Sequence, residues 1–358
     1  MPQLFSPTTF GDLSVANRVV MAPLTRLRSD ASGVPGAIVV EHYAQRASVG
    51  LITTEGTYPS PGSQGYPGQP GLVTPSQVAG WRRVTDAVHA AGGRIVAQIM
   101  HAGRVSHPEI TGGAAIVAPS AIAIVGEVHT PNGKQPYPVP HALQTAEIPA
   151  VVAEFVTAAQ NAISAGFDGV EIHSANGYLL HQFLAPTSNT RTDGYGGSPE
   201  NRARLAIEVV RAVAEAIGAA RVGIRISPSH NIQDVLESDA KDAAATYAAL
   251  LEAIAPLGVA YLSILHADPS GTLVQDLRAR FGGSVVLNTG FGSVTSREEA
   301  VNLVADNHAD GVAVGRLAIA NPDLVRRWQE NRELNEPNPS TFYGPDPAGY
   351  TDYPFLQN

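Results

Sequence analysis

Three side chains able to bind and protonate a substrate follow one short apolar stretch of the sequence. His173 ends the stretch, and Asn176 and Tyr178 come shortly after it. Two hydrogen-bond donors aimed at one carbonyl oxygen, with a phenol that can give a proton, would suit the activation of an electron-poor alkene. A lone histidine is more often structural. As zinc ligands the set is poor, because Asn and Tyr bind that metal weakly and no H-E-x-x-H pattern is present. We therefore predict carbonyl chemistry here and no metal site.

Glycine and arginine residues after two later apolar stretches suggest a site for a phosphate group. Gly290 and Gly292 follow the first of these stretches, and Gly315 and Arg316 follow the second. Glycine lets the backbone approach an anion closely, and arginine can bind a phosphate through two parallel hydrogen bonds. Two ordinary glycine turns beside a surface arginine would give the same pattern, so this alternative stays open.

Arg225 lies within an apolar stretch, V-G-I-R-I-S, that is typical of a buried strand. A guanidinium group there needs an acceptor or an anion, because burying an unpaired charge is costly. Either a planar ligand that becomes anionic or a buried ion pair with a carboxylate would satisfy it. Thr25, Gln98 and His101 are further polar residues at the ends of apolar stretches.

Eight short apolar stretches alternate with helical patterns along the chain, as expected of parallel βα units. They largely lack polar alternation, which is typical of strands covered on both faces. Helical spacing runs from Ile148 to Ala159 and from Ala206 to Ile217, and Gly166 is placed to end the first of these helices. The predicted strands are Val19–Ala22, Leu51–Thr54, Ile95–Ile99, Gly169–His173, Val222–Ile226, Ala260–Leu265, Val285–Asn288 and Gly311–Val314.

Eight such units favour an α/β fold of one closed (β/α)8 TIM barrel over a doubly wound sheet, which usually has fewer strands and an early glycine-rich fingerprint. No G-x-G-x-x-G follows the first predicted strand. In a barrel, catalytic groups gather where the strands end, and the loops after the seventh and eighth strands often bind phosphate. Residues 102–145, rich in Pro, Gly and His, would form a lid or capping subdomain after strand 3 of a single domain spanning residues 1–358.

Composition excludes several classes of protein. The 358 residues include 32 acidic and 23 basic side chains, a net charge of −9, which argues against binding nucleic acid. There is no cysteine, so disulfides, thiol nucleophiles and cysteine-bound iron–sulfur clusters are excluded, and Lys134 and Lys241 are the only lysines. Residues 1–10 show no secretory signal, and residues 112–128 are too short a stretch to span a membrane, so we expect a cytoplasmic protein.

The chain resembles the old yellow enzymes, flavin-dependent ene-reductases on a (β/α)8 barrel, in motifs spread over nearly its whole length. Because these motifs occur in the same order and at the predicted strand ends, chance agreement is implausible. They are MAPLTR at 21–26, TEGT at 54–57, GYPGQPG at 65–71, QIMHAGR at 98–104, EIHSANGYLLHQFL at 171–184, RTDGYGGSPENR at 191–202, RISP at 225–228, DGVAVGRLAIANPDL at 310–324 and FYG with GYTDYP between 342 and 354.

This resemblance implies a non-covalently bound FMN. Thr25 would hydrogen-bond the C4 carbonyl of the flavin, Gln98 would bind its pyrimidine edge, and Arg225 would lie near N1 and the C2 carbonyl, where negative charge collects in reduced flavin. The residues that complete the implied cofactor site are Pro23 and Gly56, through backbone against the ring, and Gly290, Gly315 and Arg316 at the 5′-phosphate.

The resemblance also implies the activity of an NADPH dehydrogenase or alkene reductase. NADPH, or NADH, would give hydride to flavin N5 and leave, and an α,β-unsaturated carbonyl compound or nitroalkene would then bind over the same face, in ping-pong order. His173 and Asn176 would bind its oxygen, N5 would deliver hydride to the β-carbon, and Tyr178 would protonate the α-carbon. The remaining substrate-binding residues would be Tyr66, Met100 and Tyr343.

Three positions depart from the pattern of some relatives. Asn176 stands where some carry a second histidine, and Met100 replaces an aromatic residue, which should widen the pocket. Thr25, in a chain without cysteine, places the protein outside the branch with cysteine beside the flavin.

Two other functions stay open from the residues alone. A flavin-barrel 2-hydroxy-acid oxidase would need a lysine at a strand end, and neither lysine lies at one. A non-catalytic barrel could use the same polar residues to bind a metabolite. In all three cases the expected partners are small molecules rather than nucleic acid or a membrane, and the protein would be a monomer or a homodimer.

Overall fold

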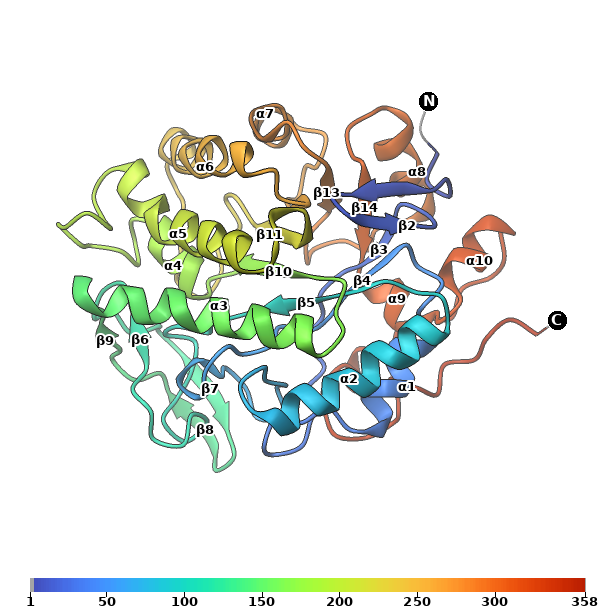
Figure 1. The fold of residues 1–358 in the computed structure, drawn as a ribbon, viewed down its shortest axis with the longest axis horizontal. Coiled ribbons are helices and arrows are strands. Elements are labelled where there is room, and N and C mark those ends of the chain that lie inside the picture. Colours follow the sequence, from blue (N-terminus) through green and yellow to red (C-terminus); the bar gives the residue numbers. More distant parts are fainter. Residues whose placement is uncertain (1–2, 358) are drawn as a thin grey trace.

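Eight parallel strands close into a barrel in the computed structural model, which describes residues 3–357 (Figure 1). Each barrel strand lies beside the next barrel strand along the chain, and helices cover the outside. The barrel strands are β3 (Val19–Met21), β4 (Leu51–Thr53), β5 (Ile95–Ile99), β10 (Gly169–Ser174), β11 (Val222–Ile226), β12 (Tyr261–Leu265), β13 (Val285–Asn288) and β14 (Gly311–Val314).

The prediction of a closed (β/α)8 barrel is confirmed. Strands β5, β11, β13 and β14 have the predicted bounds, and the other four differ by one residue at one end. Such short strands are recognisable because both of their faces are buried, so most of each stretch is apolar.

Capping residues fix the ends of the helices that pack on the barrel. At the start of α5 (Pro199–Ile217) the Ser198 side chain accepts a hydrogen bond from the backbone N–H of Asn201, and Gly218 follows the helix with a φ of +91°. Gly166, with a φ of +88°, follows α3 (Ile148–Ser164) as predicted. The helices are α1 (Ala37–Gln45), α2 (Pro75–Ala90), α3 (Ile148–Ser164), α4 (Leu179–Leu184), α5 (Pro199–Ile217), α6 (Ala240–Ile254), α7 (Thr272–Phe281), α8 (Arg297–Ala305), α9 (Arg316–Ala320) and α10 (Leu324–Gln329), with short 3-10 turns at Pro61–Ser63, Thr145–Glu147, Ala219–Arg221, Ala255–Leu257 and Pro339–Thr341.

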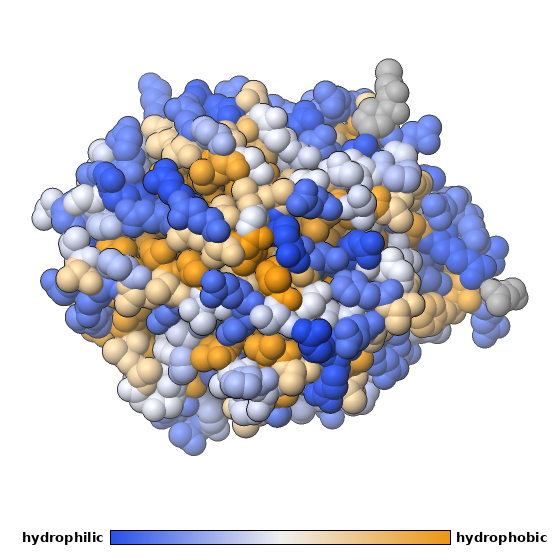
Figure 2. Space-filling model, viewed as in Figure 1, coloured by the Kyte–Doolittle hydropathy of each residue, from blue (hydrophilic) through white to orange (hydrophobic). Residues whose placement is uncertain are grey.

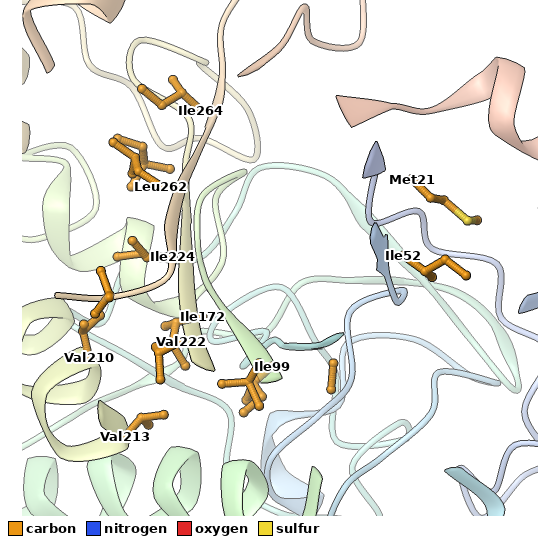
Figure 3. Packing of buried hydrophobic residues seen from close by; sticks show 14 of the residues in the cluster. Met21, Ile52, Ile99, Ile172, Val210, Val213, Val222, Ile224, Leu262 and Ile264 are labelled. Atoms are coloured by element: carbon orange, nitrogen blue, oxygen red, sulfur yellow. The ribbon is translucent and has the colours of Figure 1, made fainter. Parts of the chain in front are cut away.

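The strand side chains alternate between two apolar cores. One core lies between the strands and the helices, where Ile172 and Val222 pack with Val210 and Val213 of α5 (Figure 3). The other fills the inside of the barrel and includes Val96 and other residues of the strands. This alternation leaves every second strand residue pointing into the barrel.

A β-hairpin that the sequence analysis did not predict closes the end of the barrel where the strands begin. Its strands are β1 (Thr8–Phe10) and β2 (Leu13–Val15). The Phe10 ring lies 5.9 Å from the ring of Tyr261, and a Cβ at Gly311 would lie 2.8 Å from the Phe10 ring. With this end filled, the opposite end, which we call the barrel mouth, is where a ligand can enter.

The long excursion predicted at residues 102–145 lies between β5 and α3 and contains two small sheets. Strands β6 (Val117–Ala118) and β9 (His141–Ala142) pair in one, and β7 (Glu127–Thr130) and β8 (Gly133–Pro136) form a hairpin in the other. Figure 1 shows both at one end of the barrel, beside α3. Its role as a lid stays a prediction.

The surface carries both polar and apolar side chains. The face drawn in Figure 2 combines charged and polar side chains with small apolar areas. Within residues 3–357, no helix has the length and apolar character needed to cross a bilayer.

Candidate active site

The register of the barrel strands brings several predicted residues together at the mouth. His173 of β10 is paired with Arg225 of β11, which is paired in turn with Ser263 of β12. One step deeper, Glu171 of β10 is paired with Gln98 of β5. Paired residues of parallel strands point to the same side, so these side chains form two rows inside the barrel.

Arg225 hydrogen-bonds to neutral groups and keeps one nitrogen free. Its Nη1 donates to the Ser263 hydroxyl at 3.0 Å and its Nη2 to the Asn288 side-chain oxygen at 3.2 Å. Its Nε is buried and has no hydrogen-bond partner among residues 3–357, and burial lowers the pKa of the guanidinium. The charge is therefore partnered by a hydroxyl and an amide rather than by a direct ion pair, which leaves it able to bind an anionic ligand.

The loops after β13 and β14 meet in one pocket, together with the end of β3. Thr289 and Thr295 join their hydroxyls at 2.8 Å across the first loop, and Arg316 donates to the carbonyl of Phe291. Gly290 has a φ of +90°, a conformation that favours glycine. The residues predicted for the cofactor that line this pocket are Pro23, Arg225, Gly290, Gly315 and Arg316.

His173 presents a neutral imidazole with a defined tautomer. Its Nδ1 accepts the backbone N–H of Ala175 at 3.2 Å, so the ring proton must be on Nε2. Burial, reinforced by Arg225 and His181, holds the pKa of His173 well below its usual range. His173 is therefore a neutral hydrogen-bond donor at physiological pH.

Asn176 lies in a left-handed backbone conformation, with a φ of +56°, that turns the loop after β10. Its N–H donates to the Ser227 hydroxyl at 2.9 Å, and its carbonyl accepts from Gln233 at 3.1 Å. Its side-chain oxygen is buried and has no hydrogen-bond partner in the described structure. A buried side-chain oxygen without a partner is unusual in a folded protein and is consistent with a residue that binds a ligand.

Tyr178 is joined to a second tyrosine. Its hydroxyl lies 2.9 Å from that of Tyr66, and its ring meets the His173 ring edge-on with centroids 5.0 Å apart. Burial raises the pKa of Tyr178, so the phenol keeps its proton at neutral pH. Met100 packs in the same small apolar cluster as Tyr178 and Tyr66, and a Cβ at Gly56 would lie 2.5 Å from its sulfur.

Tyr343 is placed by the first barrel loop. The guanidinium of Arg26 donates to the carbonyl of Phe342 at 2.9 Å, and that of Arg28 donates to the carbonyl of Thr341 at 2.9 Å. Tyr343 itself is exposed. Burial is the main cause of the raised pKa of Tyr66 and of Tyr178, and Tyr343 adds to it in both cases. Since Arg26 directly follows the half-buried Thr25, one loop supports residues of both the cofactor and the substrate predictions.

Glu171 is a site residue that the sequence analysis missed. Its buried carboxylate accepts a hydrogen bond of 2.8 Å from the amide nitrogen of Gln98. The sequence did contain an indication of its role. A charged residue within the apolar stretch of β10 needs a buried partner, just as Arg225 does in β11. Glu55 was also missed: it accepts the backbone N–H groups of Arg26 and Leu27, each at 3.0 Å, and so holds the loop after β3.

His101 is polar and follows β5, but its side chain contacts α3 rather than the other site residues. Its Nδ1 accepts the N–H of Gly103 at 3.0 Å, its Nε2 lies 3.6 Å from Glu154 of α3, and its ring stacks on Phe155. Burial lowers the pKa of His101 to about 3. His101 is therefore a structural residue.

The lowered pKa of His101 predicts that the protein loses stability in acid. Replacing this histidine should make that loss smaller. Below pH 6.5 the unfolded chain binds a proton at this histidine that the folded chain does not, so stability falls as the pH falls from 6.5 towards 3. The loss is about 2 kcal/mol at pH 5. In His101→Asn, whose side-chain oxygen can still accept the N–H of Gly103, the fall in unfolding free energy between pH 7 and pH 5 should be smaller by about this amount. Urea titrations at both pH values measure it, and equal falls in the two proteins would contradict the assignment.

The fold and the mouth together show a closed (β/α)8 barrel with a pocket between the loops after β13 and β14. The family described as NADH:flavin oxidoreductase / NADH oxidase matches residues 3–335. The chain belongs to this family, and the predicted relationship to the old yellow enzymes is confirmed. It is therefore an oxidoreductase that works with a flavin and a nicotinamide cofactor.

Similar proteins are known from several sources. A probable flavin mononucleotide-dependent alkene reductase of Leishmania infantum is 46% identical, with 99% of this chain and 97% of the relative covered. 12-Oxophytodienoate reductase 1 of Oryza sativa subsp. japonica is 42% identical, with 99% and 93% covered. Among solved structures, morphinone reductase in complex with tetrahydroNAD is 45% identical with a TM-score of 0.94, covering 100% of this chain and 99% of that one. The old yellow enzyme homologue from Zymomonas mobilis is 40% identical with a TM-score of 0.94, covering 99% and 100%.

Proposed function

We propose that this chain is an FMN-dependent ene-reductase that uses NADPH or NADH to reduce the C=C bond of α,β-unsaturated carbonyl compounds or nitroalkenes. The observation that carries the proposal is the pairing of a neutral His173, whose Nε2 donates, with the protonated phenol of Tyr178 next to it. Family membership and the alkene reductases among its relatives support it.

The residues at the mouth fit a flavin mononucleotide. Within the part of the chain that the structure describes, the Nε of Arg225 is a buried donor without a partner, as a site for an electron-rich ring edge requires. Bound FMN supplies the hydride acceptor and donor of the reaction. Thr25, Gln98 and Arg225 would hold the ring with the backbone at Pro23 and Gly56, and Gly290, Gly315 and Arg316 would hold the phosphate.

The remaining side chains act on the alkene substrate. His173 and Asn176 donate hydrogen bonds to its carbonyl or nitro oxygen, which draws electrons from the alkene and stabilises the negative charge that develops on that oxygen. Because His173 is neutral, it donates without transferring its proton. Tyr178 gives its proton to the α-carbon, and the Tyr66 hydroxyl at 2.9 Å can stabilise the phenolate that results. Met100 and Tyr343 border the substrate.

Anaerobic mixing tests this function. Purified protein with FMN should bleach on addition of NADPH, and 2-cyclohexenone should restore the yellow colour. A 2-hydroxy-acid oxidase would instead be reduced by a hydroxy acid, and a non-catalytic barrel would show neither change. Failure of both NADPH and NADH to bleach the flavin, or failure of 2-cyclohexenone to restore the colour, would end the ene-reductase proposal.

Removing the charge of Arg316 should weaken the binding of FMN much more than that of riboflavin. In Arg316→Met we expect the affinity for FMN to fall by about 10- to 100-fold, since a charge-assisted hydrogen bond to phosphate is worth about 1.5–3 kcal/mol. The affinity for riboflavin, which lacks the phosphate, should change less than threefold. Quenching of flavin fluorescence by the apoprotein measures both. An equal loss for the two flavins would remove Arg316 from the phosphate site.

The proposal extends to the organisation of the molecule. Residues 1–358 would form one domain with residues 102–145 as its cap, supported by the position of the two small sheets between β5 and α3. We also propose a cytoplasmic monomer or homodimer that acts on small molecules and binds neither nucleic acid nor a membrane.

A further inference from the structure

The buried carboxylate of Glu171 lies inside the barrel, one row of side chains below His173 and Arg225. Glu171 is only 1% exposed. Its Oε1 accepts the hydrogen bond from Gln98. Burial raises the pKa of Glu171, and the charge of Arg225 offsets part of that rise. The Tyr261 hydroxyl is the third group close enough to act on it. Burying a charged carboxylate costs free energy, so the position of Glu171 inside the barrel needs an explanation.

A glycine in β11 makes room for the Tyr261 ring beside Glu171. Glu171 is paired with Gly223 of β11, and Gly223 is paired with Tyr261 of β12. A Cβ at Gly223 would lie 2.4 Å from the Tyr261 ring, so glycine is required for that ring to occupy the inside of the barrel. The room left by Gly223 thus brings a phenol towards the carboxylate.

The carboxylate has two consequences for its neighbours. Because it can only accept hydrogen bonds, the amide nitrogen of Gln98 must face it, and the amide oxygen of Gln98 must face away as an acceptor. In addition, its negative charge offsets the positive charge of Arg225 at short range. Both effects act on groups that the proposed function assigns to the flavin ring.

We infer that Glu171 is a positioning residue that fixes the orientation of the Gln98 amide and offsets the charge of Arg225, so that the site binds reduced flavin less tightly, relative to oxidised flavin, than it otherwise would. This inference rests on the proposed FMN site. It concerns how strongly the protein favours flavin reduction, because an anion near the ring opposes the charge that reduction adds.

Glu171→Gln separates the charge from the hydrogen bond. The new amide oxygen can still accept from Gln98, but the negative charge is gone. We expect the ratio of the dissociation constants of oxidised and reduced FMN to rise about tenfold, which corresponds to a potential about 30 mV higher for a two-electron couple. Fluorescence titration of the apoprotein gives the constant for oxidised FMN. Equilibration of the bound flavin with a redox dye gives the potential, from which the ratio follows.

Glu171→Asp is the matched control, because it keeps the charge and draws it away from Gln98. Both dissociation constants should then rise by a similar factor, with their ratio within about threefold of wild type. Circular dichroism of each apoprotein establishes folding first. If Glu171→Gln does not fold, Glu171→Met removes the same charge without a polar group to satisfy, and the same rise in the ratio is expected.

The outcomes distinguish this inference from the proposed function. If the wild-type protein binds no FMN, the proposed function fails. If it binds FMN but the folded neutral variants have an unchanged or lower ratio, the inference about Glu171 is overturned while the function stands.

Discussion

Reduction of 2-cyclohexenone by the reduced Tyr178→Phe enzyme is expected to be about 10²- to 10⁴-fold slower than by wild type, the usual range for loss of a positioned general acid. Reduction of the bound flavin by NADPH should stay within about threefold, because that step takes no proton from Tyr178. Stopped-flow spectroscopy under anaerobic conditions measures the two half-reactions separately. An equal loss in both would contradict the role of Tyr178 as proton donor.

Tyr66→Phe is the control for this substitution. It removes the other member of the 2.9 Å hydroxyl pair but leaves the proton of Tyr178 in place. We expect alkene reduction to slow by less than about tenfold, the value of one neutral hydrogen bond. If Tyr66→Phe were instead as slow as Tyr178→Phe, the assignment of the proton to Tyr178 rather than to Tyr66 would be wrong.

The barrel could be predicted from the sequence because its strands are buried on both faces. Stretches such as Val222–Ile226 and Val285–Asn288 are apolar at all but one position each, and their bounds were predicted correctly. The hairpin of β1 and β2 was missed because its strands are only three residues each, with polar residues among them, and only packing of Phe10 on Tyr261 shows its purpose. Short elements of this kind depend on tertiary contacts rather than on local pattern.

The sequence predicted the residues of the candidate site more readily than the contacts between them. The polar residues at strand ends lead to His173, Arg225 and Arg316, and the structure brings Arg225 and Arg316 into one pocket. The hydroxyl contact between Tyr66 and Tyr178 joins residues 112 positions apart, which no local spacing indicates. Gln233, whose amide holds the carbonyl of Asn176, lies on a different barrel loop and was missed for the same reason.

Replacing His173 with alanine is expected to weaken the binding of phenolic ligands by about 30- to 300-fold and to lower kcat/KM for enones by about 10²- to 10³-fold, the usual effect of losing one donor to a developing oxyanion. Flavin affinity should change by less than about threefold, because His173 binds the substrate oxygen rather than the cofactor. Flavin absorbance changes on titration with a phenol measure the first quantity. Unchanged phenol affinity would remove His173 from the oxygen site.

Two further measurements separate a hydrogen-bonding role of His173 from a charged one. Because its pKa is held well below its usual range, phenol affinity in wild type should show no transition near pH 6.5 that His173→Ala abolishes. Asn176→Ala should weaken phenol binding too, and because both side chains donate to one oxygen, the double variant should lose less than the product of the two single losses. A pH transition near 6.5 lost in His173→Ala would mean that a charged imidazole binds the ligand. Fully multiplicative losses would mean that the two residues act on different atoms, and the donor pair would then have to be divided between two ligand groups.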